Sequence, residues 1–202
     1  MKTNNIFCSK FPIVWHVAHA ANVDGILRNG FMSTTRILEL GQMKSNVYRN
    51  ENSLVQTGEY GEIKIRDQKP MPPNALAHCL TQGLTPEKWY EILNSKIFFW
   101  VSEKKALTFQ NAYSKDNQPQ VVLGFCTQSI LRDYENIAFL TPINTGATNG
   151  YGKRGIQTFH PITSWIKNGF TDQPQRKSYI PREFVLETPH VNLNHALKIR
   201  HD

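Results

Sequence analysis

The sequence is poor in cysteine and has no long apolar run, and each shortage excludes a class of protein. The three cysteines, Cys8, Cys79 and Cys126, are widely spaced and odd in number, which excludes a disulfide framework and a Cys-x-x-Cys metal site. No apolar run approaches the ~20 residues of a membrane helix, and residues 1–16 lack the continuous apolar region of a signal peptide. We therefore expect a cytoplasmic protein with reduced thiols and no contact with a membrane.

Metal-binding patterns are missing among the histidines as well. His16 and His19 have the spacing of one helical turn, but the apolar run before them indicates a strand. The seven histidines contain neither an HExxH motif nor a comparable ligand pair: they are His16, His19, His78, His160, His190, His195 and His201. We therefore predict that no metal is bound.

Runs of more than two basic residues are also absent, although the formal net charge is +7. A basic excess favours a polyanionic partner such as nucleic acid. The chain has no RNA-recognition or zinc-finger signature, so a basic enzyme without such a partner is an equally good interpretation. Apolar residues make up 40% of the chain and aromatic residues 11%, which supports a packed core rather than a disordered chain.

Short strand patterns alternate with short helix patterns. Thr85 and Pro86 supply an N-cap and a first helical residue, and Ser102 is placed to start a helix that includes Phe109. This alternation indicates one α+β domain over residues 1–202, with residues 41–95 as an insertion or covering lobe. The patterns predict strands over 11–16, 97–101, 120–127, 137–140 and 184–186, helices over 22–29, 35–40, 75–80 and 85–94, and a glycine-rich loop over 144–155.

Three segments, in this order, resemble the signature regions of the ADP-ribosyltransferase fold. The first is Trp15-His16 followed by a helix that ends at Gly30. The second is the aromatic strand 97–100 with the helix after it, and the third is the Glu-Phe-Val-Leu strand that begins at Glu183. The pattern is that of the diphtheria-toxin and poly(ADP-ribose) polymerase type, summarised as His-Tyr-Glu. The spacing is also similar to that of the DarT toxins, which ADP-ribosylate DNA bases.

The resemblance implies a fold, a co-substrate and a set of site residues. The fold is α+β, with a split mixed or antiparallel sheet and short helices around a cleft for NAD. Glu183 is the implied catalytic residue. His16, at the end of its strand, and the backbone of Val17 are implied to bind NAD. Phe109 or Tyr113 is implied to stack on the nicotinamide ring, and the choice between them stays open.

Basic residues in and after the glycine-rich loop extend this hypothesis to the substrates. Lys153 and Arg154 are candidates for the NAD pyrophosphate or a substrate phosphate. The basic residues of this region, together with nearby aromatic side chains on which bases can stack, are candidates for binding nucleic acid: Lys153, Lys167, Arg176 and Lys177, with Tyr151, Trp165 and Tyr179. The expected function is an NAD-dependent mono-ADP-ribosyltransferase that modifies a base of single-stranded RNA or DNA, as a bacterial toxin or phage-defence effector with a possible antitoxin partner.

Other interpretations of the same residues stay open. The enzyme alternatives are transfer to protein and plain NAD hydrolysis, and the alternative from another class is an inactive module that binds nucleic acid or protein. Glu183 could instead form a surface ion pair with Arg182, and Glu187 is the nearby competitor for the catalytic role. A structural role for His16 or a core position for Phe109 would likewise remove them from the site.

Overall fold

The computed structural model describes residues 4–43, 54–65, 71–114, 119–148, 152–167 and 180–202. Its centre is a seven-stranded sheet in the order β11-β6-β1-β5-β9-β7-β8, and every described pair of neighbours is antiparallel. The α+β prediction is confirmed, with an antiparallel rather than a mixed sheet. The strands are β1 (Ile13–His19), β5 (Ile97–Trp100), β6 (Gln120–Cys126), β7 (Ala138–Thr141), β8 (His160–Pro161), β9 (Glu183–Leu186) and β11 (Leu197–His201).

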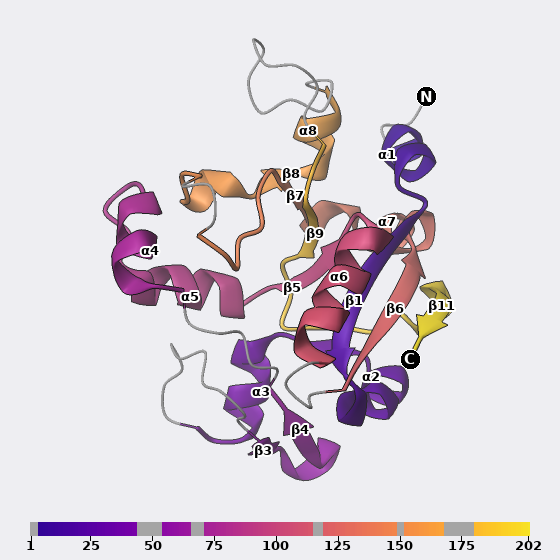
Figure 1. The fold of residues 1–202 in the computed structure, drawn as a ribbon. Helices are drawn as coiled ribbons and strands as arrows, with labels where there is room; N and C mark the ends of the chain where they lie inside the picture. Colours follow the sequence, from indigo (N-terminus) through magenta and orange to yellow (C-terminus); the bar gives the residue numbers. More distant parts are fainter. Residues whose placement is uncertain (1–3, 44–53, 66–70, 115–118, 149–151, 168–179) are drawn as a thin grey trace.

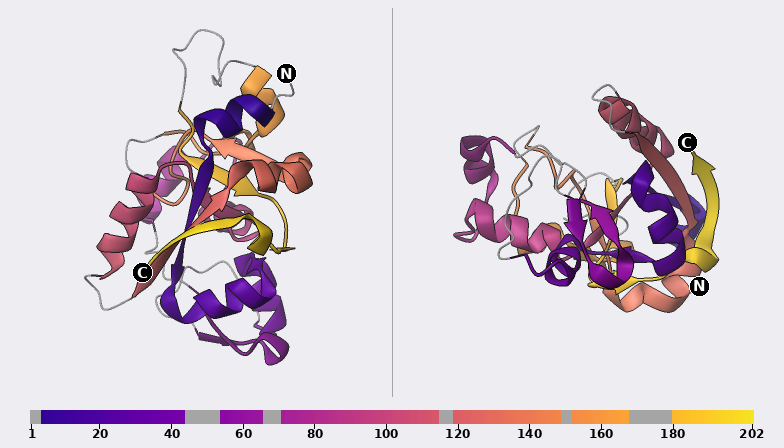
Figure 2. Two further views of the ribbon diagram at one scale, coloured as in Figure 1. Left: turned by 90° about the vertical axis from the view of Figure 1, so that its right-hand side faces the viewer. Right: turned by 90° about the horizontal axis from the view of Figure 1, so that it is seen from below.

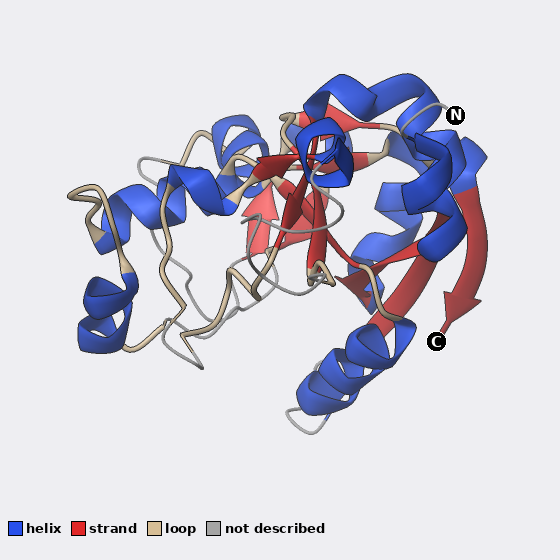
Figure 3. Cartoon of the chain, turned by 90° about the horizontal axis from the view of Figure 1, so that it is seen from above, coloured by secondary structure: helices blue, strands red, loops and turns tan. Residues whose placement is uncertain are grey.

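Helices lie on both sides of this sheet (Figure 3). Local sequence explains several boundaries: Thr85 Oγ1 accepts from the backbone N–H of Lys88 at 3.3 Å to cap α5, and Gly30 ends α2 at a φ of +89°. The helices are α1 (Asn4–Lys10), α2 (Val23–Asn29), α3 (Thr34–Leu40), α4 (Pro73–Cys79), α5 (Pro86–Asn94), α6 (Glu103–Ser114), α7 (Thr127–Tyr134) and α8 (Ile162–Lys167).

The register of the sheet sorts side chains onto its two faces. Trp15 pairs with Trp100, Trp100 with Glu183, and Glu183 with Thr141, so these four side chains form a row on one face. Helix α6 packs on that face, across β1 and β6 (Figure 1). The opposite face carries the main core, in which Phe99, Phe184 and Leu140 pack together with Phe7, Phe31 and Phe125.

Residues of the expected covering lobe occupy two places beside the sheet. The hairpin of β3 (Leu54–Gln56) and β4 (Glu62–Lys64) lies near α2 and α3, whereas α4 and α5 lie on the side of the molecule away from β6 and β11 (Figures 1 and 2). Trp89 and Leu93 of α5 pack with Val185 of β9. A last short ladder joins β2 (Phe31–Met32) to β10 (His190–Val191). Within the described residues, we find no helix with the length and apolar character needed to cross a membrane.

Candidate functional site

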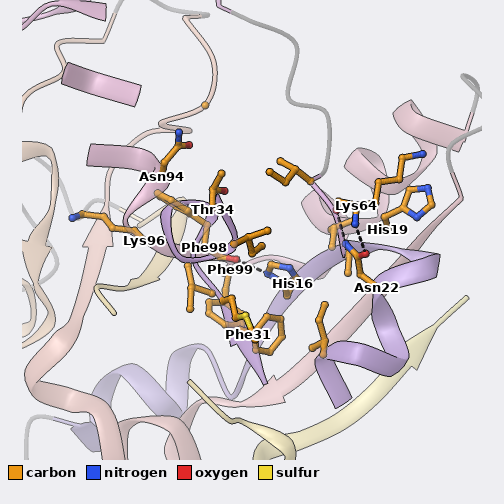
Figure 4. Close-up of a pocket in the computed structure, with 18 of the residues that line it drawn as sticks. His16, His19, Asn22, Phe31, Thr34, Lys64, Asn94, Lys96, Phe98 and Phe99 are labelled. Atoms are coloured by element: carbon orange, nitrogen blue, oxygen red, sulfur yellow. Dashed lines mark hydrogen bonds between the residues drawn. The ribbon is translucent and has the colours of Figure 1, made fainter. Parts of the chain in front are cut away.

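The described part of the chain encloses a cavity of about 850 Å³, which lies within the range of small-molecule sites. Its walls come from segments that are far apart in the sequence: β1, α2, the β3–β4 hairpin, β5, α6, and residues 144–148. Figure 4 shows one part of the lining, with His16 between a group around Asn94 and a group around His19. The cavity brings together Glu183, His16, Val17, Phe109 and Tyr113, five of the residues expected to form the site.

The cavity opens where the sheet splits between β1 and β5. The register of these strands gives a single paired position, Trp15 opposite Trp100. Beyond it, His16 Nδ1 lies 2.8 Å from the carbonyl oxygen of Phe98 (Figure 4). Since a carbonyl can only accept, Nδ1 donates here. The imidazole therefore replaces the backbone ladder at the point where the two strands part.

The prediction that β1 ends at His16 is wrong. The strand continues to His19 because Val17 and His19 still pair with β6, opposite Val122 and Gln120. It is the pairing with β5, not the strand, that stops at His16. Side chains alternate along a strand, so the side chain of His16 leaves the sheet on the face opposite that of Glu183. Both line one cavity because the sheet splits between β1 and β5.

Two phenylalanines fix the ring of His16. Its centroid lies 4.7 Å from that of Phe31 and 5.5 Å from that of Phe99, both in edge-on arrangements. These contacts and the bond to Phe98 hold the imidazole in one orientation. His16 therefore has a structural part in joining β1 to β5, while its side chain still forms part of the cavity wall.

Glu183 begins β9, and its side chain is only 5% exposed. Its Oε2 accepts from Thr141 Oγ1 at 2.9 Å and from Thr145 Oγ1 at 3.0 Å. The backbone N–H of Thr145 lies 3.2 Å from Oε1 and 3.3 Å from Oε2. Glu183 was also considered as one half of a surface ion pair with Arg182. In the structure Arg182 is exposed, whereas the carboxylate of Glu183 is buried and accepts from Thr141 and Thr145. The carboxylate is thus held by donors that are already in place.

The competitor Glu187 lies directly after the other end of β9. It forms an ion pair with Lys96, and about half of its side-chain surface is exposed. Glu187 does not line the cavity. In the structure, Glu183 is therefore the glutamate of this strand that faces the site.

Three aromatic rings form one wall of the cavity beside Glu183. Ring centroids are 5.8 Å apart for Trp100 and Phe109, and 4.9 Å apart for Phe109 and Tyr113. Phe109 and Tyr113 are one turn apart on α6, so they share a face of that helix. We call Trp100, Phe109 and Tyr113 the aromatic wall. From the sequence, Trp100 was expected in an aromatic strand and not among the site residues, because an apolar strand does not show that the sheet splits beside it.

Two of the basic residues expected at the site, Lys153 and Arg154, do not line the cavity. Arg154 is 1% exposed, does not line the cavity, and donates to the carbonyls of Ala147 and Gly152. Burial lowers the pKa of its guanidinium, while nearby Cys79 and Glu183 act in the opposite direction. Lys153 is exposed and donates to the His78 carbonyl at 3.4 Å. Lys167 ends α8; its side chain, and Arg176 and Lys177, lie outside the described residues.

His19 and Asn22 extend the site beyond the expected residues. The Asn22 amide donates to the Lys64 carbonyl at 2.6 Å and accepts from the Lys64 N–H at 3.0 Å, which attaches the β3–β4 hairpin to the cavity wall (Figure 4). His19 Nδ1 accepts from the backbone N–H of Ala21 at 3.2 Å. Burial, together with the charge of Lys64, lowers the pKa of His19. No group of three His, Cys, Asp or Glu residues within the described segments is arranged to hold a metal ion.

Comparison with known proteins places the chain in a family. Residues 12–197 match a family of unknown function (DUF7002). This match covers most of the chain, so the chain belongs to that family. A search of curated proteins gives no match. What the site does must therefore be inferred from its own chemistry.

Proposed function

We propose that this member of a family of unknown function is an NAD-dependent mono-ADP-ribosyltransferase with an ADP-ribosyltransferase-like split sheet. One observation carries the proposal: the buried carboxylate of Glu183, held by Thr141 and Thr145, shares a cavity with the aromatic wall and His16. The order of these residues along the chain is that of the His-Tyr-Glu pattern. The cavity, at about 850 Å³, has room for an extended ligand.

The site residues fit what NAD cleavage requires. The bond between nicotinamide and ribose breaks, nicotinamide leaves with the bonding electron pair, and positive charge develops on the ribose. A carboxylate that needs no reorganisation stabilises this charge more than it stabilises the ground state. Glu183 meets that condition because Thr141 and Thr145 already orient its oxygens.

The other walls supply binding contacts. The electron-poor nicotinamide ring favours an aromatic partner, which Phe109 or Tyr113 of the aromatic wall provides. His16 would hydrogen-bond a ribose hydroxyl, and the backbone of Val17 would contact the nicotinamide half of NAD. Arg154 is not among these contacts, since it does not line the cavity.

We propose a nucleic-acid base as the acceptor. A ring or amino nitrogen of the base forms the new bond to the ribose carbon and gives its proton to Glu183. The base must be unstacked to enter, which favours single-stranded RNA or DNA. The net charge of +7 supports this choice. A toxin or phage-defence role, with an antitoxin partner, follows from the resemblance to DarT toxins.

Labelled NAD tests the proposal. The purified protein is incubated with NAD labelled in the adenylate half and with separate pools of single-stranded RNA, single-stranded DNA and protein. Label should appear on a nucleic acid with the wild type and with Glu187→Gln, the matched control directly after the same strand, but not with Glu183→Gln. Label on protein would replace the proposed acceptor, and free ADP-ribose alone would indicate an NAD hydrolase. If the protein neither binds NAD nor turns it over, the transferase is refuted and a binding module remains.

A further inference from the structure

Arg154 is a buried cation without a carboxylate partner. Its side chain is 1% exposed, and no ion pair joins it to an acid among the described residues. Its guanidinium donates to the carbonyls of Ala147 and Gly152, and its buried Nε has no hydrogen-bond partner. Burying a charge in this way is costly, so the residue needs a role that a neutral side chain would not fulfil.

The backbone of Arg154 is anchored to the end of α4. Its N–H donates to the Cys79 carbonyl at 2.8 Å, and its carbonyl accepts from the Thr81 N–H at 2.8 Å and from Thr81 Oγ1 at 3.0 Å. A Cβ at the next residue, Gly155, would lie 2.4 Å from Thr81 Oγ1, so glycine permits this close approach. The guanidinium therefore extends from a fixed point.

The groups that accept from the guanidinium lead directly to the site. Ala147 belongs to the segment 144–148, all of which lines the cavity. Within this segment Gly146 N–H donates to Asn144 Oδ1 at 3.0 Å, which closes a turn around Thr145. The N–H and hydroxyl of Thr145 then hold Glu183. Arg154 thus lies one segment behind the carboxylate, on the side away from the cavity.

We propose that Arg154 is a positioning residue: it fixes segment 144–148 from behind, so that Thr145 holds Glu183 in its working orientation. Arg154 itself does not touch NAD. The proposal rests on the proposed function of Glu183. A cation suits this place because it attracts the buried carboxylate while its two NH₂ groups bind two carbonyls at once, which a lysine ammonium cannot do in the same planar geometry.

The test compares Arg154→Lys and Arg154→Gln with the wild type in NAD cleavage. Misplacing a catalytic group by about 1 Å costs roughly 100-fold in rate, so kcat should fall by about 10- to 100-fold while KM for NAD stays within about threefold. Arg132→Lys is the matched control, because Arg132 is exposed and pairs with Asp133. Its kinetics should equal those of the wild type.

Hydrogen exchange of the Thr145 amide gives a second readout that does not depend on activity. Arg154→Lys should lower the protection of this amide at least tenfold, while amides of β6 keep theirs. A raised KM with unchanged kcat would show that Arg154 contacts NAD and would overturn the proposal, as would unchanged kcat or unchanged protection of Thr145. If the wild type does not cleave NAD, the proposed function fails, and the exchange measurement still decides whether Arg154 positions the segment.

Discussion

Replacing Glu183 by glutamine separates its chemical part from its structural part. The amide is close to isosteric with the carboxylate, and its Oε1 can still accept from the Thr145 N–H, now at 3.2 Å. An amide nitrogen in the place of Oε2 can donate to Thr141 Oγ1. The hydroxyl hydrogen of Thr141, otherwise shared with Glu183, then goes to the Ile143 carbonyl, 2.8 Å away. Thr145 Oγ1, which lies 3.0 Å from Oε2 and donates to it in the wild type, can accept the second amide hydrogen, so each of these polar groups keeps a partner.

The expected magnitudes follow from this accounting. With all hydrogen bonds satisfied, Glu183→Gln should lower the free energy of unfolding by less than about 1 kcal/mol, which is less than about 4 °C in Tm for a chain of this size. Glu183→Ala leaves the buried N–H of Thr145 without its acceptor, at a cost of about 1–3 kcal/mol. The loss of the charged group should reduce NAD cleavage by roughly 100- to 1000-fold in both variants.

Thermal unfolding and NAD cleavage are measured on both variants and on Glu187→Gln. We expect a Tm for Glu183→Ala below that of Glu183→Gln, by roughly 2–4 °C for each kcal/mol of difference in the free energy of unfolding, with equally low activity in the two. A Glu183→Gln protein that cleaves NAD at more than a tenth of the wild-type rate would refute a catalytic role for the Glu183 carboxylate. Equal Tm values for the two Glu183 variants would refute the hydrogen-bond arrangement, even if no NAD cleavage were found.

Three further predictions concern the walls of the cavity. The pKa of His19 is lowered, so its contribution to stability is present above about pH 6.5 and is lost as the pH falls through the folded-state pKa; chemical unfolding between pH 5 and 7 should show a weaker pH dependence in His19→Gln. Gly30→Ala places a Cβ 2.6 Å from the Val191 carbonyl oxygen at a φ of +89°, and the free energy of unfolding should fall by about 1–3 kcal/mol; an unchanged value would contradict the described β2–β10 contact. Asn22→Ala removes both bonds to Lys64, so proteases should cut the β3–β4 hairpin faster, and unchanged cleavage would show that other contacts attach it.

Local signals in the sequence determined the individual elements. Thr85 and Pro86 start α5, Asn29 and Gly30 end α2, and the apolar runs 97–100 and 120–126 form β5 and β6. These assignments succeed because caps, glycine conformation and apolar periodicity act over a few residues. They fail for α7 and β11, which carry no comparable signal: the sequence predicted neither, and β11 exists because the edge of β6 is available to pair with it.

The site shows the same division. The chain order of His16, Phe109 and Glu183 suggested a site from sequence alone, and all three line one cavity. Nothing local indicated that Thr145 would hold Glu183, or that Trp100 would join the aromatic wall.

Arg154 shows the limit most clearly. As a charged residue in a loop it was expected to bind a phosphate. It is instead buried behind the segment 144–148. Sequence determines which groups a chain offers and the short elements that carry them. Tertiary structure alone decides which groups face the cavity, because strand register, the split between β1 and β5, and the pairing of buried polar atoms join residues that lie far apart along the chain.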